Sequence, residues 1–148
     1  MTPQSQDMDG GKEMDTRDLA AMILSSGREG ITISGGEPFL QAAGLSELID
    51  LLRAQRDIGI IVYTGFTIEE IREKNDPDMT RFLDQIDLLI DGPYIEEKND
   101  GRNLRGSSNQ RAIALTERYE TNVPDYGSRT AEIELFVKED KVVLVGVP

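Results

Sequence analysis

Three short apolar runs, rich in β-branched residues, alternate with helix-like patterns along the first two thirds of the chain. The runs cover residues 31–33, 58–63 and 88–90, and each is followed by a turn that contains glycine. Unbroken apolar runs of this length are typical of strands buried on both faces of a parallel sheet. Successive runs begin roughly 30 residues apart, which is the size of a strand–helix repeat with a right-handed crossover.

The segments between these runs carry apolar residues at helical spacing. We expect helices that begin after Asp15 or Thr16, that cover residues 45–52, that follow the capping box of Thr67 and Glu70, and that begin at Pro77. Near the end of the chain, residues 133–137 and 142–147 flank a Glu139-Asp140 turn and predict a β-hairpin. The predicted fold class is α/β, a partial barrel of parallel βα units with a C-terminal β-hairpin.

We predict a single domain over residues 1–148. Residues 1–14 are expected to be a loop or disordered, 15–94 to hold the βα repeats, 95–130 to form a long polar loop region with a brief strand at 112–115, and 131–148 to form the hairpin. A polar connection as long as 95–130 is usually functional or disordered.

Charge and composition narrow the function classes. The 148 residues include 16 Lys and Arg against 28 Asp and Glu, a formal net charge of −12. Such an excess of negative charge repels nucleic acid and anionic membranes. No apolar segment approaches the roughly 20 residues that a membrane span requires, and the start shows no signal-peptide pattern. We therefore expect a cytoplasmic protein that binds neither nucleic acid nor membrane.

The sequence contains no cysteine and no histidine. Disulfides, thiolate clusters, histidine general bases and the commonest zinc sites are therefore excluded within these 148 residues. A nucleophile with an adjacent base is not visible either.

The loops that follow the three predicted strands should lie side by side, because ligands in such sheets bind at the carboxyl ends of strands. Together with the polar segment 105–111 they offer carbonyls and a carboxylate for an ammonium group, and amide or guanidinium groups for a carboxylate. This favours a zwitterionic small molecule. The candidate binding residues are Ser34, Gly35, Gly36, Glu37, Pro38, Thr64, Asp91, Asn109 and Arg111.

Each candidate also has a purely structural interpretation. For the glycine pair this is a tight turn, for Glu37 a cap of the next helix, and for Arg111 the offset of local acidity. Asp91, Glu96 and Glu97 could suggest a magnesium site, but an acidic protein solvates many carboxylates, and we predict no metal-binding residue in this chain.

Four motifs resemble, in order, those of the radical S-adenosylmethionine activating enzymes. They are TISGGEP at 32–38, VYTGF at 62–66, LIDGPY at 89–94 and RGSSNQR at 105–111. The resemblance extends from about Gly10 onward. It is strongest to the activating enzymes of anaerobic ribonucleoside-triphosphate reductase, which are related to the pyruvate formate-lyase activating enzyme.

The resemblance implies an oxidoreductase with S-adenosylmethionine and a 4Fe-4S cluster as cofactors. In that family the cluster cleaves S-adenosylmethionine reductively, and the resulting radical abstracts hydrogen from a glycine of the partner, here anaerobic ribonucleotide reductase. The resemblance places Gly35, Gly36 and Glu37 at the amino group of S-adenosylmethionine, and Thr64 and Asn109 near its ribose or methionine part. Asp91 and Arg111 would line the same edge of the sheet.

The chain departs from the family in its lack of the Cys-x-x-x-Cys-x-x-Cys loop that binds the cluster. Residues 2–5 resemble those that follow the third cysteine in the family, so we expect a truncated chain that is inactive alone, with the cluster loop and first strand preceding Met1. A missing first strand should leave a bare sheet edge beside residues 31–33, open to pairing with a second copy. The alternative is a non-catalytic domain that binds a nucleoside or S-adenosylmethionine, or that only docks a partner.

Overall fold

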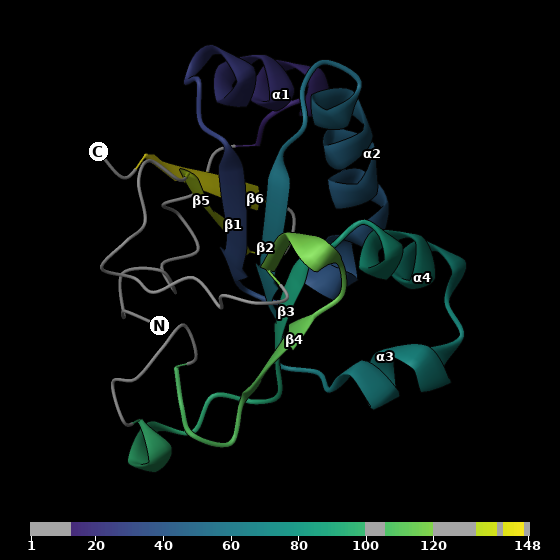
Figure 1. Ribbon diagram of the computed structural model, residues 1–148, viewed down its shortest axis with the longest axis vertical. Coiled ribbons are helices and arrows are strands. Elements are labelled where there is room, and N and C mark those ends of the chain that lie inside the picture. Colours follow the sequence, from purple (N-terminus) through teal and green to yellow (C-terminus); the bar gives the residue numbers. More distant parts are fainter. Residues whose placement is uncertain (1–12, 100–105, 120–132, 139–140, 147–148) are drawn as a thin grey trace.

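The molecule is built on a six-stranded mixed sheet with helices packed against it (Figure 1). The structure, a computed structural model, describes residues 13–99, 106–119, 133–138 and 141–146. The sheet order is β4-β3-β2-β1-β5-β6. The strands are β1 (Gly30–Gly35), β2 (Gly59–Tyr63), β3 (Leu88–Asp91), β4 (Arg111–Ala114), β5 (Ile133–Lys138) and β6 (Lys141–Gly146). The helices are α1 (Thr16–Ser25), α2 (Ala42–Arg53), α3 (Ile68–Lys74) and α4 (Pro77–Asp84), with 3₁₀ helices at Pro38–Gln41, Glu96–Lys98 and Glu117–Tyr119.

The first three strands form a parallel core in which sequence neighbours are also spatial neighbours. Ile31 of β1 pairs with Ile60 of β2, and Ile61 of β2 pairs with Leu88 of β3. Helix α2 connects β1 to β2, and α3 and α4 connect β2 to β3. The predicted βα repeats are therefore confirmed, and all three carboxyl ends lie at one edge of the sheet.

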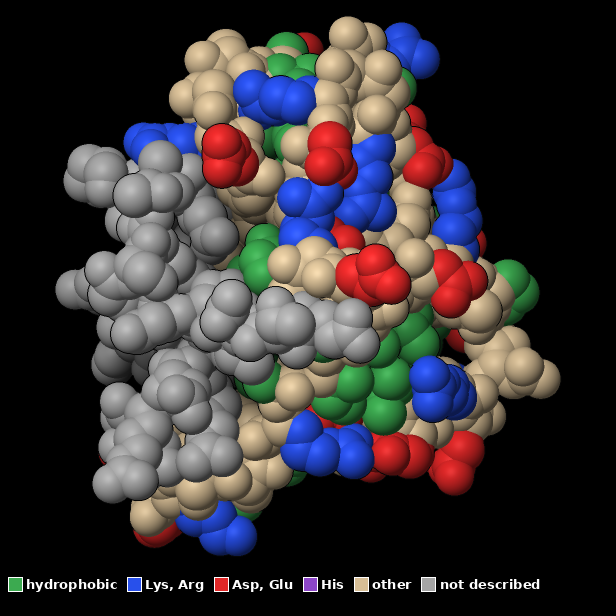
Figure 2. All heavy atoms as spheres, viewed as in Figure 1, with side chains coloured by type: hydrophobic (Ala, Val, Ile, Leu, Met, Phe, Trp, Pro, Cys, Tyr) green, Lys and Arg blue, Asp and Glu red, His purple; other side chains and the backbone are tan. Residues whose placement is uncertain are grey.

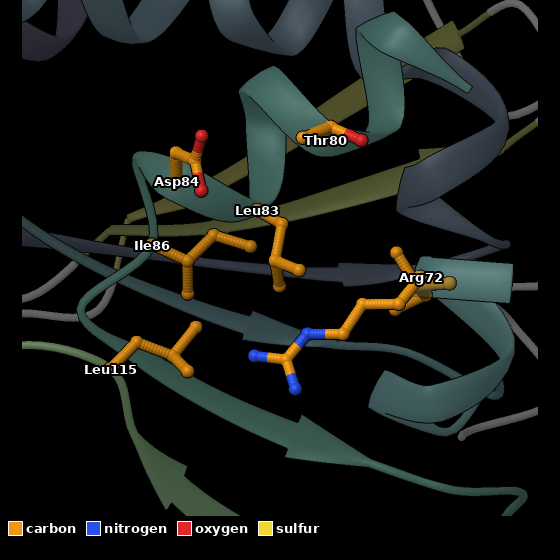
Figure 3. A pocket seen from close by; sticks show the side chains of 7 residues that line it. Arg72, Thr80, Leu83, Asp84, Ile86 and Leu115 are labelled. Carbon is orange, nitrogen blue, oxygen red and sulfur yellow. The ribbon is translucent and has the colours of Figure 1, made fainter. Parts of the chain in front are cut away.

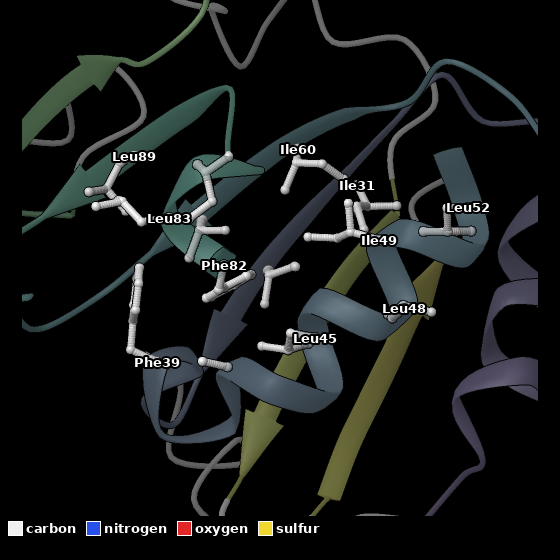
Figure 4. Packing of buried hydrophobic residues seen from close by; sticks show 14 of the residues in the cluster. Ile31, Phe39, Leu45, Leu48, Ile49, Leu52, Ile60, Phe82, Leu83 and Leu89 are labelled. Carbon is white, nitrogen blue, oxygen red and sulfur yellow. The ribbon is translucent and has the colours of Figure 1, made fainter. Parts of the chain in front are cut away.

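All four helices bury their apolar residues against the same face of the sheet (Figure 4). The cluster contains Ile23 of α1, Ile49 of α2, Ile71 of α3 and Phe82 of α4, each at most 1% exposed. The ring of Phe39 lies 4.9 Å from that of Phe82 and joins the 3₁₀ helix after β1 to α4. Alternate strand positions contribute to this cluster, whereas Ile61, Leu88 and Ile90 form a second cluster on the opposite face.

Polar side chains fix where the helices begin. Asp15 caps α1 by accepting from the backbone N–H of Arg17 at 2.8 Å. Thr67 and Glu70 form the predicted capping box of α3, and Asp76, followed by Pro77, caps α4. These bonds satisfy N–H groups that the first helical turn leaves unpaired.

The predicted C-terminal hairpin is confirmed, since β5 pairs antiparallel with β6. The predicted bare edge beside residues 31–33 is wrong, because β5 pairs in parallel with β1 from Ile31 to Gly35. The bare edge was the reason to expect a homo-oligomer, and this edge of β1 is already paired within the chain. The pattern of β5 predicted a hairpin but gave no information about this long-range pairing.

The opposite edge of the parallel core is covered by β4, which pairs antiparallel with β3. The predicted brief strand at 112–115 is therefore present, shifted by one residue. The α/β class is confirmed, but the sheet is open and both of its outer strands are antiparallel to their neighbours. Residues 1–12 of the predicted amino-terminal loop, and residues 100–105 and 120–130 of the predicted polar segment, lie outside the described residues. No helix in the described ranges has the length and apolar composition needed to cross a membrane.

At the amino ends of β2 and β3, Asp87 joins several elements. Its Oδ2 accepts from the backbone N–H of Ile60 and from Arg53 Nη2, both at 2.8 Å, and its Oδ1 accepts from Thr116 Oγ1 at 2.7 Å. Asp87 is 4% exposed, so these bonds compensate for the burial of its carboxylate. The bonds tie α2, β2 and the segment after β4 together.

Candidate functional site

The carboxyl ends of β1, β2 and β3 meet at the lower end of the sheet in Figure 1, as the sequence predicts. The loops after these strands and the segment 106–111 gather there, and we call this region the strand-end rim. Hydrogen bonds between loops, rather than helix packing, determine its shape. Their geometry shows which of the predicted residues lie together.

Glu37 joins the β1 and β2 loops. Its Oε1 accepts from Thr64 Oγ1 at 2.6 Å and from the backbone N–H of Phe39 at 3.1 Å, and its Oε2 accepts from the N–H of Gly65 at 2.9 Å. The bond to Phe39 makes Glu37 the N-cap of the 3₁₀ helix Pro38–Gln41. A carboxylate has about four acceptor positions, so one position, on Oε2, is left for a further donor.

Backbone bonds join the β2 and β3 loops. The N–H of Thr64 donates to the carbonyl of Ile90 at 3.0 Å, and the N–H of Gly92 donates to the carbonyl of Phe66 at 2.9 Å. Gly92 has a φ of +98°, in the region that favours glycine over other residues. The turn after β3 therefore depends on this glycine.

Asp91, Arg111 and Glu69 form a charged cluster at the edge of the rim. Arg111 Nε donates to Asp91 Oδ1 at 2.9 Å, and Arg111 Nη2 donates to Glu69 Oε2 at 2.7 Å. Asp91 Oδ2 also accepts from the backbone N–H of Ile68, the first residue of α3, at 2.8 Å. The side chain of Asp91 is fully buried, while those of Arg111 and Glu69 are about half exposed. The cluster thus ties α3 and β4 to the end of β3.

Hydrogen bonding shifts two pKa values in this cluster. The bond from Arg111 lowers the pKa of Glu69 from 4.5 to about 2. The bonds to Asp91 and then to Glu69 raise the pKa of Arg111 above its ordinary value. Both shifts favour the charged forms, so the pairing is intact at neutral pH.

Strand alternation places Asp91 and Arg111 on the face of the sheet that the helices cover. Asp91 lies two residues after Leu89, which belongs to the helix-facing core, and Arg111 pairs with Asp91 across the β3–β4 ladder. Ser34 follows Ile33, another member of that core, and so lies on the opposite face. The predicted candidates are therefore divided between the two faces at the rim.

The segment 106–110 is held against the β3 loop by amide side chains. Gln110 Oε1 accepts from the N–H groups of Gly106 and Ser107 at 2.8 and 3.1 Å, and its Nε2 donates to the carbonyl of Gly92 at 2.9 Å. Asn109 Nδ2 donates to the carbonyl of Pro93 at 2.7 Å. Ser107 Oγ donates to Asn109 Oδ1 at 2.7 Å and accepts from the N–H of Ile95.

The structure thus brings the predicted residues together in three groups: Glu37 with Thr64, Asp91 with Arg111, and Asn109 with the loop after β3. Sequence reasoning assigned no role to Gln110 or to Glu69. Gln110 stands in the RGSSNQR motif and is buried, and Glu69 stands in the first turn of α3. The only sequence signal for Glu69 was the capping box of Thr67 and Glu70, which places Glu69 in the first turn of a helix that follows the β2 loop.

The rim offers binding groups without a nucleophile. Iron–sulfur clusters are held by cysteine thiolates, and the chain supplies none. The residues of this chain therefore do not fit a 4Fe-4S cluster as ligands. Within the ranges that the structure describes, no group of three carboxylates is placed to hold a metal ion.

A hollow of about 280 Å³ lies away from the rim, between α3, α4 and the end of β4 (Figure 3). Its apolar lining residues are Ile71, Leu83, Ile86 and Leu115. Arg72 lies at its side (Figure 3). The hollow shares no residue with the strand-end rim, so it is not part of the candidate site.

Charged side chains of both signs are interspersed on the described surface shown in Figure 2. Several form ion pairs between neighbouring elements, as Arg81 does with Asp50 and Arg118 with Asp57. Exposed pairs of this kind contribute little to stability.

Comparison with known proteins identifies the family. A model of the 4Fe-4S single cluster domain matches residues 1–113. The anaerobic ribonucleoside-triphosphate reductase-activating protein of Vibrio cholerae is 36% identical over 88 residues, which are 56% of this chain and 54% of that protein. The protein of the same name from Pasteurella multocida is 34% identical over 95 residues, covering 61% of this chain and 58% of the relative.

A third activating protein of this name, from Enterobacteria phage T4, is 28% identical over 106 residues, covering 68% of this chain and 63% of the relative. The chain thus spans a little over half the length of the curated relatives it matches. No solved structure is significantly similar to it. Because the family model matches most of its length, this chain belongs to the 4Fe-4S single cluster domain family.

Proposed function

We propose that this chain forms the S-adenosylmethionine-binding part of an activating enzyme for anaerobic ribonucleotide reductase. Its relatives carry that activity in their names, and the four motifs that resemble the radical S-adenosylmethionine enzymes lie in the strand-end rim and the segments joined to it. The proposed activity is that of a cytoplasmic oxidoreductase that acts on a glycine of the reductase.

The position of Glu37 carries this proposal. It joins the β1 and β2 loops with three hydrogen bonds and keeps one acceptor position on Oε2, beside Gly36, which is exposed. In the proposal this oxygen and the carbonyls of Gly35 and Gly36 bind the ammonium group of S-adenosylmethionine. The net charge of −12 also favours a ligand that carries a sulfonium and an ammonium.

The remaining predicted residues have two kinds of proposed role, shaping the ammonium site or positioning its loops. Ser34 lies at the end of β1, and Pro38 fixes the turn beyond Glu37, so both shape the ammonium site. Thr64 acts through Glu37. Asn109 uses its amide on the chain itself, and Asp91 and Arg111 neutralise each other, so we assign these three the role of positioning the loops of the site.

The open sheet is proposed to be the core of an incomplete α/β barrel. The sequential order β1, β2, β3 and the packing of all four helices on one face support this, because doubly wound sheets place helices on both faces. The other face would then be the interior, where Ser34 lies.

The chain has no cysteine and so cannot by itself hold the cluster that the proposed activity uses. A 4Fe-4S cluster supplies the electron for cleavage of S-adenosylmethionine in this family, and no residue of these 148 is a fitting ligand. The ligands would have to come from outside this sequence. For this reason a second candidate remains, a non-catalytic domain that binds S-adenosylmethionine or a nucleoside, or that docks a partner.

Calorimetric titration of the chain tests binding at the rim. S-adenosylmethionine should bind, and 5′-methylthioadenosine, which lacks the amino acid, should bind at least tenfold more weakly. Glu37→Ala should remove most of this difference, whereas Glu47→Gln, an exposed carboxylate on α2, should leave it unchanged. Equal affinity of the two ligands for the unaltered chain would contradict the assigned ammonium site.

Iron reconstitution separates the two candidate functions. A chain extended by the codons upstream of Met1, if these encode the three-cysteine loop, should take up iron and cleave S-adenosylmethionine when reduced. An extended chain that binds S-adenosylmethionine but no iron would favour the non-catalytic domain.

A further inference from the structure

A groove beside the strand-end rim has the chemistry of a protein-docking site. It has a volume of about 590 Å³ and lies between the 3₁₀ helix Pro38–Gln41 and the start of α4. Phe39, Leu40, Gln41 and Met79 are among the residues that line it, together with Asp76 and Asp78. Glu37 caps the 3₁₀ helix that lines the groove, so the groove adjoins the residue that is proposed to bind the ligand.

Leu40 is the most exposed large apolar side chain in the described part of the chain, at 71%. The neighbouring Phe39 is buried in the core. The backbone N–H of Leu40 donates to the carbonyl of Glu37 at 3.1 Å. The backbone of Leu40 is therefore anchored within the 3₁₀ helix, and its side chain lies outside the core. A single exposed leucine is ordinary, but one on an anchored backbone at the wall of a groove is well placed for an apolar contact.

The polar groups of the groove complement a peptide that carries a positive charge. Asp76 uses only Oδ1 to cap α4, and Asp78 is exposed and forms no ion pair with another described residue.

We propose that this groove docks the reductase, through a segment that places an apolar side chain against Leu40 and Met79 and a Lys or Arg beside Asp78. The inference rests on the proposed function, because a partner whose glycine must reach the rim has to contact the surface around it. Docking at this groove would hold the partner's segment next to the bound S-adenosylmethionine.

Binding of the anaerobic reductase to the 148-residue chain, measured by biolayer interferometry, tests the proposal. Leu40→Asp should weaken binding at least tenfold, and Leu40→Ala should weaken it less. Met22→Asp is the matched control, because Met22 is an exposed apolar residue, 45% exposed, on α1. It should bind like the unaltered chain. Circular dichroism confirms that each variant is folded.

Charge is tested separately. Asp78→Asn should weaken binding and flatten its dependence on salt, because one screened ion pair is lost. Unchanged binding in Leu40→Asp and Asp78→Asn, or no binding by the unaltered chain, overturns the docking site. Titration of the same preparations with S-adenosylmethionine distinguishes this from failure of the proposed function, which would appear as lost ligand binding in the unaltered chain.

Discussion

The hydroxyl of Thr64 donates a 2.6 Å hydrogen bond to the carboxylate of Glu37, across two loops that are 27 residues apart in sequence. Thr64 is 3% exposed, so the bond is shielded from water. The same hydroxyl accepts from the N–H of Phe66 at 3.2 Å, which extends the connection to the β2 turn. Thr64 thus uses its hydroxyl within the chain, and it fixes the Glu37 carboxylate that is proposed to bind the ligand.

Replacing Thr64 by Val tests whether the Thr64 hydroxyl holds the Glu37 carboxylate in place. Valine fills a similar volume but leaves Glu37 and the N–H of Phe66 without one partner each, so we expect a loss of about 1–3 kcal/mol in the free energy of unfolding. Urea unfolding measures this loss. Affinity for S-adenosylmethionine should also fall, because the carboxylate is no longer held in place.

Thr64→Ser keeps the hydroxyl and is the control for this prediction. It should retain most of the affinity even if it loses some stability from the missing methyl group. A Thr64→Val variant with full affinity would show that the position of Glu37 does not depend on this bond.

Acid should weaken the pairing of Arg111 with Glu69. The pKa of Glu69 is about 2 in the folded chain against an ordinary 4.5, so its stabilising contribution is complete above pH 4.5 and is lost as the pH falls toward 2. Glu69→Gln lacks this titration. Its unfolding free energy should therefore fall less steeply than that of the unaltered chain over this acid range.

The two chains should show parallel pH profiles above pH 4.5, where Glu69 is charged in both states. Because Glu69 is exposed, added salt should reduce the difference between them. Identical acid slopes at low salt would contradict the lowered pKa.

The predictable part of this fold is the part that is coded locally. The apolar runs, the capping box of Thr67 and Glu70, and Pro77 at the first position of α4 fixed the elements of the parallel core correctly. The pairing of β5 with β1 could not be predicted, because it joins residues about a hundred positions apart through backbone groups that every strand carries. The bare edge and the possible oligomer were inferred only because that pairing was unknown.

In the candidate site, too, the local features could be predicted and the long-range pairing could not. Glycine turns after strands indicated which loops would meet at the rim. Which polar groups pair within it depends on side-chain direction, and strand alternation turns Asp91 and Arg111 toward α3, where Glu69 completes the cluster. The sequence placed both residues at the binding edge of the sheet but did not indicate that they pair with each other and with Glu69.

Gln110 should be essential for the fold of the segment that precedes β4. Its amide oxygen accepts two backbone N–H groups and its amide nitrogen donates to the carbonyl of Gly92, all in a side chain that is 7% exposed. Gln110→Ala leaves these groups unpaired and should destabilise the chain by about 2 kcal/mol. Limited proteolysis within residues 106–110 should become faster.

Gln110→Glu tests the donor alone. The carboxylate keeps both acceptor contacts but opposes the carbonyl oxygen of Gly92, so the variant should be destabilised at neutral pH and should recover as acid protonates it. Equal stability of Gln110→Glu and the unaltered chain at all pH values would contradict the bond to Gly92.

Two glycines should respond in opposite directions to substitution by alanine. A Cβ on Gly59, at the start of β2, would lie 2.5 Å from Tyr119 Oη and 3.0 Å from Arg118 Cδ, so these two side chains of the 3₁₀ helix Glu117–Tyr119 would have to shift. We expect Gly59→Ala to destabilise the chain by about 1–3 kcal/mol.

Gly44 in α2 has nothing within 4 Å of a built Cβ. Gly44→Ala should stabilise the chain by about 0.5–1 kcal/mol, because alanine restricts the unfolded chain and favours a helix. Thermal and urea unfolding of the two variants measure both effects. If Gly59→Ala were as stable as Gly44→Ala, the segment after β4 would not be packed against β2 as the structure describes.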